Sequence, residues 1–509
     1  MFYIIQFDVH VITRFFIYLF LYWCANLNIF HNISRWISSI KRIDGYIRWG
    51  LNKPLFRAAI YITVAFWSIN DPMGLSSAAD RALSNQLGRF RAFMQPISTA
   101  PITVVNIDYP SITGLHNSGD GWMVADDWPL TYADHGRILR DLAMPRHGES
   151  APAAIFYDIL FERPRVTSGN LDSLGRTLSR LKENHNAARI YLAGGGSFLS
   201  MSKQSLVQLN NPSLAVSAWE GVGDNYPLQA QLGNVVENEM TGSAASILYQ
   251  ELCRARHEDC RWIQSADLPP LSPQWYITGN SDCPAGKISI WHDVRALIMR
   301  LAAFSVSLKN PPSSCMPVHQ VRLSQLYGDQ PVSLRPPHIR LGEPYVVLVG
   351  NVMPSLNDYV ESTLYGQIAG VYLHANALIN LVNQGEQYIK ERDVFWFSLF
   401  TLLVTINLCM WFRGAFGHDG WFGRRRIWLV NAISKVERIG HGSLIIKVFK
   451  SMLIVVLYAV TVIAGYMVFS MFNEHPQGWL VLLAFIPFLK EVVLSGESRY
   501  VQDNEDSYE

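Results

Sequence analysis

Short, continuous apolar runs alternate with stretches of helical periodicity along the middle of the chain. Runs such as ITVVNID and YVVLVG have no polar face, which is typical of strands that are buried on both sides of a sheet. On this basis we predict strands over residues 102–108, 153–158, 189–193 and 345–350, with residues 287–291 as a further candidate. The glycine- and aspartate-rich residues after the first of these strands are predicted to form a loop.

Helices are predicted where apolar residues recur every three or four positions. Asp134 stands three residues after Thr131, as in a capping box, and Ile138, Leu139 and Leu142 then form an apolar stripe. Similar patterns predict helices over residues 171–181, 243–252, 292–303 and 369–383. The alternation of strands and helices predicts an α/β fold, a three-layer domain with a largely parallel sheet.

Apolar stretches almost free of charge flank this region and predict transmembrane α-helices. Residues 394–412 and 451–473 each match the roughly 20 residues that a helix needs to cross a bilayer. Residues 54–70 contain one charged residue, Arg57, near their start. Residues 475–494 would cross the membrane if the side chain of Lys490 reaches back to the interface. Within the N-terminal segment 1–53, residues 15–30 are a membrane or an interfacial helix.

The charges beside these helices predict the topology. Residues 31–57 and 413–450 are rich in Lys and Arg, so both are expected on the cytoplasmic side. Residues 71–392 then form an extracytoplasmic domain, and the acidic tail 495–509 is cytoplasmic. We expect a multi-pass protein of a bacterial inner membrane with a large periplasmic domain, and the basic run 424–426 suits contact with membrane lipids.

Composition agrees with a chain that is part soluble and part membrane-embedded. Charged residues make up 16% of the 509 residues, below the roughly 25% that is usual for soluble proteins. The 42 Lys and Arg residues balance 41 Asp and Glu residues, for a net charge of +1. This balance excludes a strongly basic nucleic-acid binder, so no nucleic-acid partner is expected.

Four of the six cysteines fall in the predicted extracytoplasmic domain, where an even number favours disulfides. We prefer Cys253 with Cys260 and Cys283 with Cys315, because this pairing closes the shortest loops. Two other pairings and four free thiols remain open. A zinc site is disfavoured because the sequence has no CxxC pair, and which metal the domain takes, if any, is left unknown.

Polar residues at the ends of predicted strands are the candidate ligand-binding residues. In open α/β sheets ligands bind outside the carboxyl ends of the strands, where Asp108, Asp158, Asn351 and Asp358 are expected to meet Trp128. Paired carboxylates could bind a cation, a sugar or an amine. The alternative is that each aspartate caps a helix or accepts hydrogen bonds from loop amides.

His374 is a further candidate, since it lies on the apolar stripe of the last predicted helix. A histidine there is either a hydrogen-bonded core residue or part of the pocket, and contact with Asp108 or Asp158 would favour the pocket. No HExxH, GxSxG or phosphate-loop motif is present, and a hydrolase would rest on the paired acids alone. We therefore expect neither catalytic activity nor a cofactor.

Five blocks of sequence together resemble a known family. In chain order they are ITVVNIDYPSI, DWPLTYADHGRILRDLA, APAAIFYDILFERPR, YVVLVGNVMPSLNDYVES and IAGVYLHANALINLVNQG. Their order and spacing resemble the CHASE family, second type, the extracytoplasmic sensing domains of cyclases and histidine kinases. The resemblance implies a sensor domain over roughly residues 76–390, an unknown extracytoplasmic ligand, and three membrane helices after the domain.

Relatives in that family commonly carry a catalytic output domain after the last helix, whereas this sequence ends at Glu509. The expectation is therefore a membrane-anchored sensor or binding protein that passes its signal to a separate partner. The alternative is a non-sensing membrane subunit that holds an envelope complex together.

Overall fold

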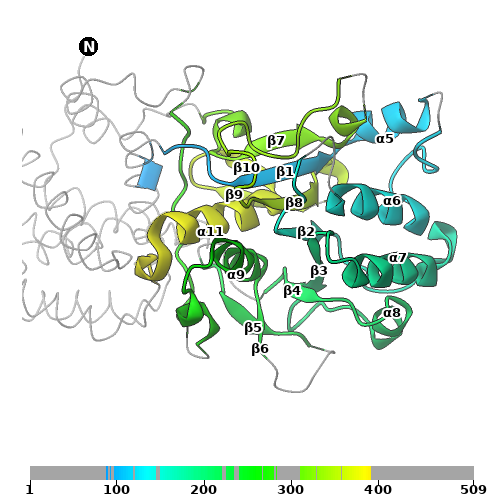
Figure 1. The fold of residues 1–509 in the computed structure, drawn as a ribbon, viewed down its shortest axis with the longest axis horizontal. Helices are drawn as coiled ribbons and strands as arrows, with labels where there is room; N and C mark the ends of the chain where they lie inside the picture. The colour runs from blue at the N-terminus through cyan, green and yellow to red at the C-terminus, as the bar shows by residue number, and fades with distance from the viewer. Residues whose placement is uncertain are drawn as a thin grey trace, which may run out of the picture.

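A six-stranded sheet forms the centre of the domain in the computed structural model (Figure 1). The structure describes residues 97–390, except 119–120, 145–148, 220–224, 234–239, 266–267, 280–282, 284–309, 328–329 and 357, together with residues 88, 89 and 92. All neighbouring strands are parallel, in the order β4-β3-β2-β8-β1-β7. Their bounds are β1 Ile102–Ile107, β2 Ala154–Asp158, β3 Arg189–Gly195, β4 Leu214–Val216, β7 His319–Arg322 and β8 Val346–Asn351.

Helices cover both faces of this sheet and give the domain three layers. One face carries α5 Tyr109–His116, α6 Tyr132–Ala143, α7 Leu171–Glu183 and α8 Lys203–Gln208. The other carries α9 Ala244–Arg256 and α11 Gly370–Gln384. Short antiparallel pairs and 3-10 turns complete the fold: β5 Gln229–Gln231 with β6 Met240–Gly242, β9 Tyr359–Ser362 with β10 Gly366–Ala369, and turns at Val166–Ser168, Arg261–Gln264, Ser313–Cys315, Leu323–Leu326, Pro354–Leu356 and Gly385–Gln387.

The central strands are mainly apolar on both faces because successive side chains enter different cores. In β8, Leu348 lies between Val104 of β1 and Phe156 of β2, and all three pack towards α9 and α11. The next residue of β8, Val349, faces the opposite core with α6 and α7. Every residue of β8 is buried, so this strand has no polar face.

Strand order places β8, the last of the six sheet strands in the chain, between β1 and β2. The chain leaves β1 and β2 towards helices on one face, whereas it leaves β8 through the β9–β10 pair to α11 on the opposite face. The connections therefore diverge at the carboxyl ends of β2 and β8, which is where open α/β sheets form their binding crevice.

The α/β prediction with a largely parallel sheet is confirmed, and so are the four main strands and the helices at α6, α7, α9 and α11. The predicted loop after the first strand is wrong in its first part, because residues 109–116 form helix α5, whereas the described residues from 117 to 131 form neither helix nor strand. Pro110 in its first turn, the side chain of Asp108 as its N-cap, and the burial of Ile112 and Leu115 stabilise this helix. The predicted strand at 287–291 and helix at 292–303 lie outside the described residues.

Both preferred disulfides are present. Cys253 at the end of α9 is bonded to Cys260, with the Cα atoms 6.1 Å apart. Cys283 is bonded to Cys315, with the Cα atoms 5.7 Å apart. Cys253, Cys260 and Glu258 are the one group of described residues with metal-ligand spacing, and the disulfide leaves no thiolate there to bind a metal.

The predicted transmembrane segments 54–70, 394–412, 451–473 and 475–494 lie outside the described residues, as do residues 15–30, the loop 413–450 and the tail 495–509. Within the described part of the chain, no helix has both the length and the apolar character needed to cross a bilayer.

Candidate functional site

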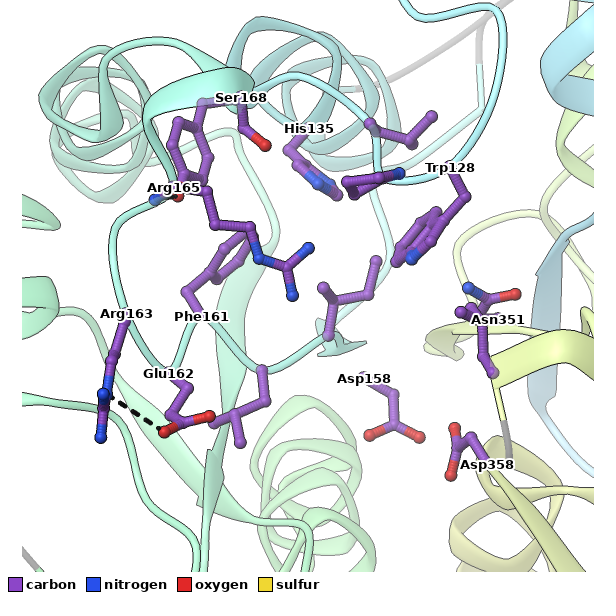
Figure 2. A pocket seen from close by; sticks show the side chains of 16 residues that line it. Trp128, His135, Asp158, Phe161, Glu162, Arg163, Arg165, Ser168, Asn351 and Asp358 are labelled. Carbon is purple, nitrogen blue, oxygen red and sulfur yellow. Dashed lines mark hydrogen bonds and ion pairs between the residues drawn. The ribbon is translucent and has the colours of Figure 1, made fainter.

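A cavity of about 250 Å³ opens at the carboxyl ends of β2 and β8 (Figure 2). Four residues expected at the ligand site line it, namely Trp128, Asp158, Asn351 and Asp358. Phe161 contributes to an apolar wall. The structure thus brings together side chains that are more than 200 positions apart in the sequence, and their role in binding stays a prediction.

Asp158 is the last residue of β2 and pairs in register with Gly350 of β8. Its side chain is 11% exposed, and no group in the described part of the chain forms a hydrogen bond with its carboxyl. Burial, and then the nearby charge of Asp358, raise the pKa of Asp158 well above its usual range. In the described part of the chain, therefore, no hydrogen-bond donor compensates the negative charge of this carboxylate.

Asp358 lies beside Asp158 on the same side of the cavity in Figure 2. Its backbone carbonyl accepts the N–H of Gly370 at 2.9 Å, which fixes it against the start of α11. A Cβ atom at position 370 would lie 2.6 Å from Oδ1 of Asp358, so any larger residue there would displace this carboxyl from its present position. Burial raises the pKa of Asp358 as well, so the two acids together favour a bound proton or another cation.

Asn351, the last residue of β8, is only 6% exposed. Its Oδ1 accepts the N–H of Met353 at 3.0 Å, which settles which end of the amide is oxygen. The buried Nδ2 has no hydrogen-bond partner among the described residues, and it is directed towards the cavity in Figure 2. A buried amide donor without a partner is costly, and an acceptor on a bound molecule would remove that cost.

Two arginines lie on the wall across from the acids. Arg163 forms an ion pair with Glu162, with Nε 3.4 Å from Oε1. Arg165 has no such partner in the part of the chain that the structure describes, and its guanidinium extends into the cavity in Figure 2. The backbone N–H of Arg165 donates to the hydroxyl of Tyr132 at 2.7 Å, which anchors the segment that carries it.

His135 of α6 forms part of the same wall. Its Nδ1 lies 2.7 Å from the hydroxyl of Tyr157. Burial is the main cause that lowers the pKa of His135 to about 3, and the charge of Arg165 lowers it further, against the opposing effect of Asp134. His135 is therefore neutral at physiological pH.

His374 contacts Asp158 from the α11 side, with Nε2 3.9 Å from Oδ2. Its Nδ1 lies 2.7 Å from the hydroxyl of Tyr226, which itself accepts the N–H of Ala245. Burial lowers the pKa of His374 to about 4, so this histidine is neutral as well. It does not line the cavity; it lies behind Asp158 and connects that carboxyl to α11.

Asp108 is the one aspartate of the predicted site that lies outside the cavity. Its Oδ1 accepts the N–H of Ser111 at 2.9 Å and caps α5, and its Oδ2 lies 3.6 Å from Nε of Arg322. The structure thus gives Asp108 the capping role that was the alternative reading. The residues that the sequence analysis missed are Arg165 and His135, since neither follows a strand directly.

Comparison with curated proteins gives no match, and comparison with solved structures gives none either. A sequence model of the CHASE2 domain, a sensory domain family, matches residues 58–412. The match covers most of the chain and includes every element of the fold and the whole cavity. This chain belongs to the CHASE2 domain family.

Proposed function

We propose that this protein is a membrane-anchored extracytoplasmic sensor that binds a small, positively charged ligand in the cavity between β2 and β8. The observation that carries the proposal is the pairing of Asp158, whose side chain is only 11% exposed, with Asp358, which lines the same cavity; neither carboxyl has a hydrogen-bond partner among the described residues. Membership of a sensory family supports a binding role for the domain.

A cationic ligand would compensate the negative charge of these two carboxylates. Loss of hydration raises the pKa of both carboxyls, and the nearby charge of Asp358 raises that of Asp158 further. An ammonium group between them would supply an opposite charge and up to three hydrogen-bond donors. The cavity of about 250 Å³ suits a small molecule, since a water molecule takes about 30 Å³ in the liquid.

The proposed role is binding and not catalysis. The two histidines nearest the acids, His135 and His374, each use Nδ1 in a contact with a tyrosine hydroxyl. In the described part of the chain, neither histidine forms a hydrogen bond with a serine or cysteine that could act as a nucleophile. Raised carboxyl pKa values occur in acid–base catalysts too, so a screen for turnover belongs beside the binding measurement.

Helix α11 is the proposed route from the cavity to the membrane. Its His374 contacts Asp158, and the helix runs on to Gln384, ten residues before the predicted membrane helix 394–412. A ligand that changes the charge of Asp158 would change the contact of that carboxyl with α11. We propose that the resulting signal passes to a separate membrane or envelope protein.

The test measures the melting temperature of the full-length protein with primary amines and amino acids of two to six carbons. At least one compound should raise the melting temperature in proportion to the logarithm of its concentration, as a ligand of the folded state does. Asp158→Asn should remove this shift, and the matched control Asp108→Asn, outside the cavity, should keep it. No shift with any compound, or an equal shift in Asp158→Asn, would overturn the proposal.

A further inference from the structure

The cavity carries opposite charges on opposite walls. Asp158 and Asp358 lie on the side of β2, β8 and α11, and Arg165 extends towards them from the segment after β2 (Figure 2). Glu162 and Arg163 neutralise each other as an ion pair at 3.4 Å. The charged groups left to meet a ligand are therefore the two carboxyls and one guanidinium.

Arg165 is held in place by its backbone. Its N–H donates to the hydroxyl of Tyr132 at 2.7 Å, and its carbonyl accepts the N–H of Ser168 at 3.2 Å, where a 3-10 turn begins. These bonds fix the point from which the side chain enters the cavity. The planar guanidinium at its tip is suited to bidentate contact with a carboxylate or similar anion.

Asn351 supplies an independent indication that the ligand carries an acceptor. Its Nδ2 is buried, is directed into the cavity and has no partner among the described residues. A simple amine offers only donors once it is protonated, so it would leave both Asn351 and Arg165 without partners. A ligand with an anionic group as well would satisfy a donor on each.

We infer, on the basis of the proposed function, that the cavity binds a small zwitterion of the amino-acid class. Its ammonium group lies between Asp158 and Asp358, and its carboxylate meets the guanidinium of Arg165. Trp128 and Phe161 of the cavity wall contact the carbon skeleton between the two charged groups.

The experiment compares matched sets of three compounds with the full-length protein by titration calorimetry. Each set contains an α- or ω-amino acid of three to six carbons, the amine that lacks its carboxylate, and the acid that lacks its amino group. For the best set, the amino acid should bind at least about tenfold more tightly than either of the other two, as one added charge-assisted contact predicts.

Variants of the cavity residues test which side chain causes the preference for the amino acid. Arg165→Gln should reduce the affinity for the amino acid to that for its amine and leave amine binding unchanged. The matched control Arg163→Gln, on the same wall but already paired with Glu162, should keep the full preference. The same titrations with Asp158→Asn should show no binding of the amino acid or of the amine.

The possible failures are distinguishable. If amines bind as tightly as the matching amino acids, or if Arg165→Gln keeps the preference, the zwitterion inference is wrong and the cationic site stands. If no compound binds, or if Asp158→Asn binds them all unchanged, the proposed function fails together with the inference.

Discussion

Asp108 and Asp158 both stand at the carboxyl ends of central strands, yet their surroundings give them different tasks. Asp108 accepts a backbone N–H at the start of α5 and lies near Arg322. Asp158 is buried beside Asp358 and has no hydrogen-bond partner in the described part of the chain. A capping carboxylate stabilises its helix, whereas a buried carboxylate without partners costs stability.

Substitutions at Asp108 should therefore affect folding and spare the cavity. Asp108→Ala should lower the free energy of unfolding by about 1 kcal/mol, and Asp108→Asn should retain most of that stability because asparagine also caps helices. Urea unfolding of both variants is the measurement. An equal loss in the two would mean that the ion pair with Arg322, and not the cap, is what matters.

The buried histidines predict how stability depends on pH. The folded-state pKa of His374 is about 4, below its ordinary 6.5, so the unfolded chain binds more protons between these values. Stability contributed by the neutral form is present above pH 6.5 and should fall by up to about 3 kcal/mol as the pH drops to 4. His135 acts in the same direction.

Unfolding measured between pH 7 and pH 4 checks this dependence. His374→Gln, which keeps an acceptor for Tyr226, should reduce the loss of stability on acidification. His185→Gln, at an exposed position, should leave the slope unchanged. A slope for His374→Gln equal to that of the natural chain would show that this histidine does not contribute to the pH dependence.

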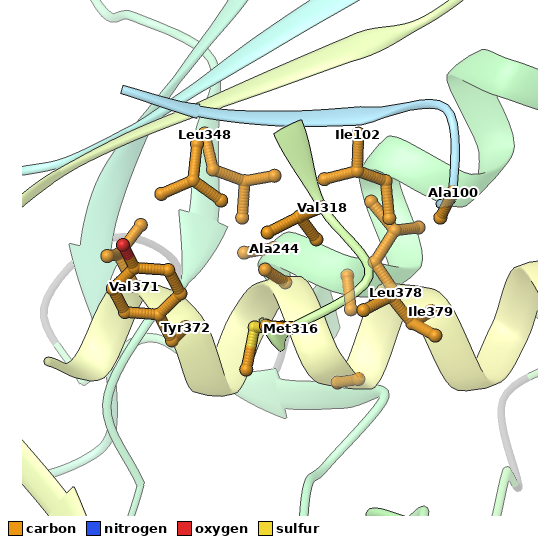
Figure 3. Packing of buried hydrophobic residues seen from close by; sticks show 14 of the residues in the cluster. Ala100, Ile102, Ala244, Met316, Val318, Leu348, Val371, Tyr372, Leu378 and Ile379 are labelled. Atoms are coloured by element: carbon orange, nitrogen blue, oxygen red, sulfur yellow. The ribbon is translucent and has the colours of Figure 1, made fainter. Parts of the chain in front are cut away.

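At the scale of elements, the fold depends on how closely α11 packs against β8. Figure 3 shows Val371, Leu378 and Ile379 of α11 facing Ile102 and Leu348 of the sheet. A Cβ atom at Gly350 would lie 2.4 Å from Cβ of Val371. Only glycine allows this approach, which places the start of α11 and its contacts with Asp158 and Asp358 beside the cavity.

Gly350→Ala should therefore lower the free energy of unfolding by about 1–3 kcal/mol, the usual cost of overpacking. The matched control is Gly114→Ala in α5, where a Cβ atom would meet nothing within 4 Å. Because alanine favours a helix more than glycine does, the control should gain about 0.5–1 kcal/mol. If Gly350→Ala is as stable as the natural chain, α11 can shift away from β8 without cost.

At the scale of the molecule, the three-layer domain ends in α11, and the chain then enters the predicted membrane helix 394–412. The sheet has helices on both faces, and disulfides join Cys253 to Cys260 and Cys283 to Cys315. Disulfides persist in oxidising compartments, which agrees with an extracytoplasmic location for residues 71–392.

Reporter fusions test this topology directly. An alkaline phosphatase fused at about residue 200 should be active, because it would lie in the periplasm. The same enzyme fused at about residue 430, in the predicted basic loop, should be inactive. Activity at 430 with none at 200 would reverse the orientation.

The sequence alone determined the elements that are apolar on both faces or capped by local signals. Strands β1, β2, β3 and β8 are long apolar runs, and α6 has its capping box at Thr131 and Asp134, so each was predicted. Helix α5 was missed because glycine, threonine and isoleucine weaken its helical signal, and burial of Ile112 and Leu115 stabilises it instead. The three residues of β4 and the four of β7 leave too short a pattern to recognise.

The sequence also placed Asp158 and Asn351 at strand ends, because parallel strands all present their carboxyl ends at one edge. It could not exclude Asp108 from the cavity, since that depends on β8 lying between β1 and β2 and on the local cap. Nor could it bring in Arg165, which reaches the cavity only because the segment after β2 is anchored on Tyr132 of α6. Strand order and contacts between distant segments are set by packing of the whole domain, and only the tertiary structure decided them.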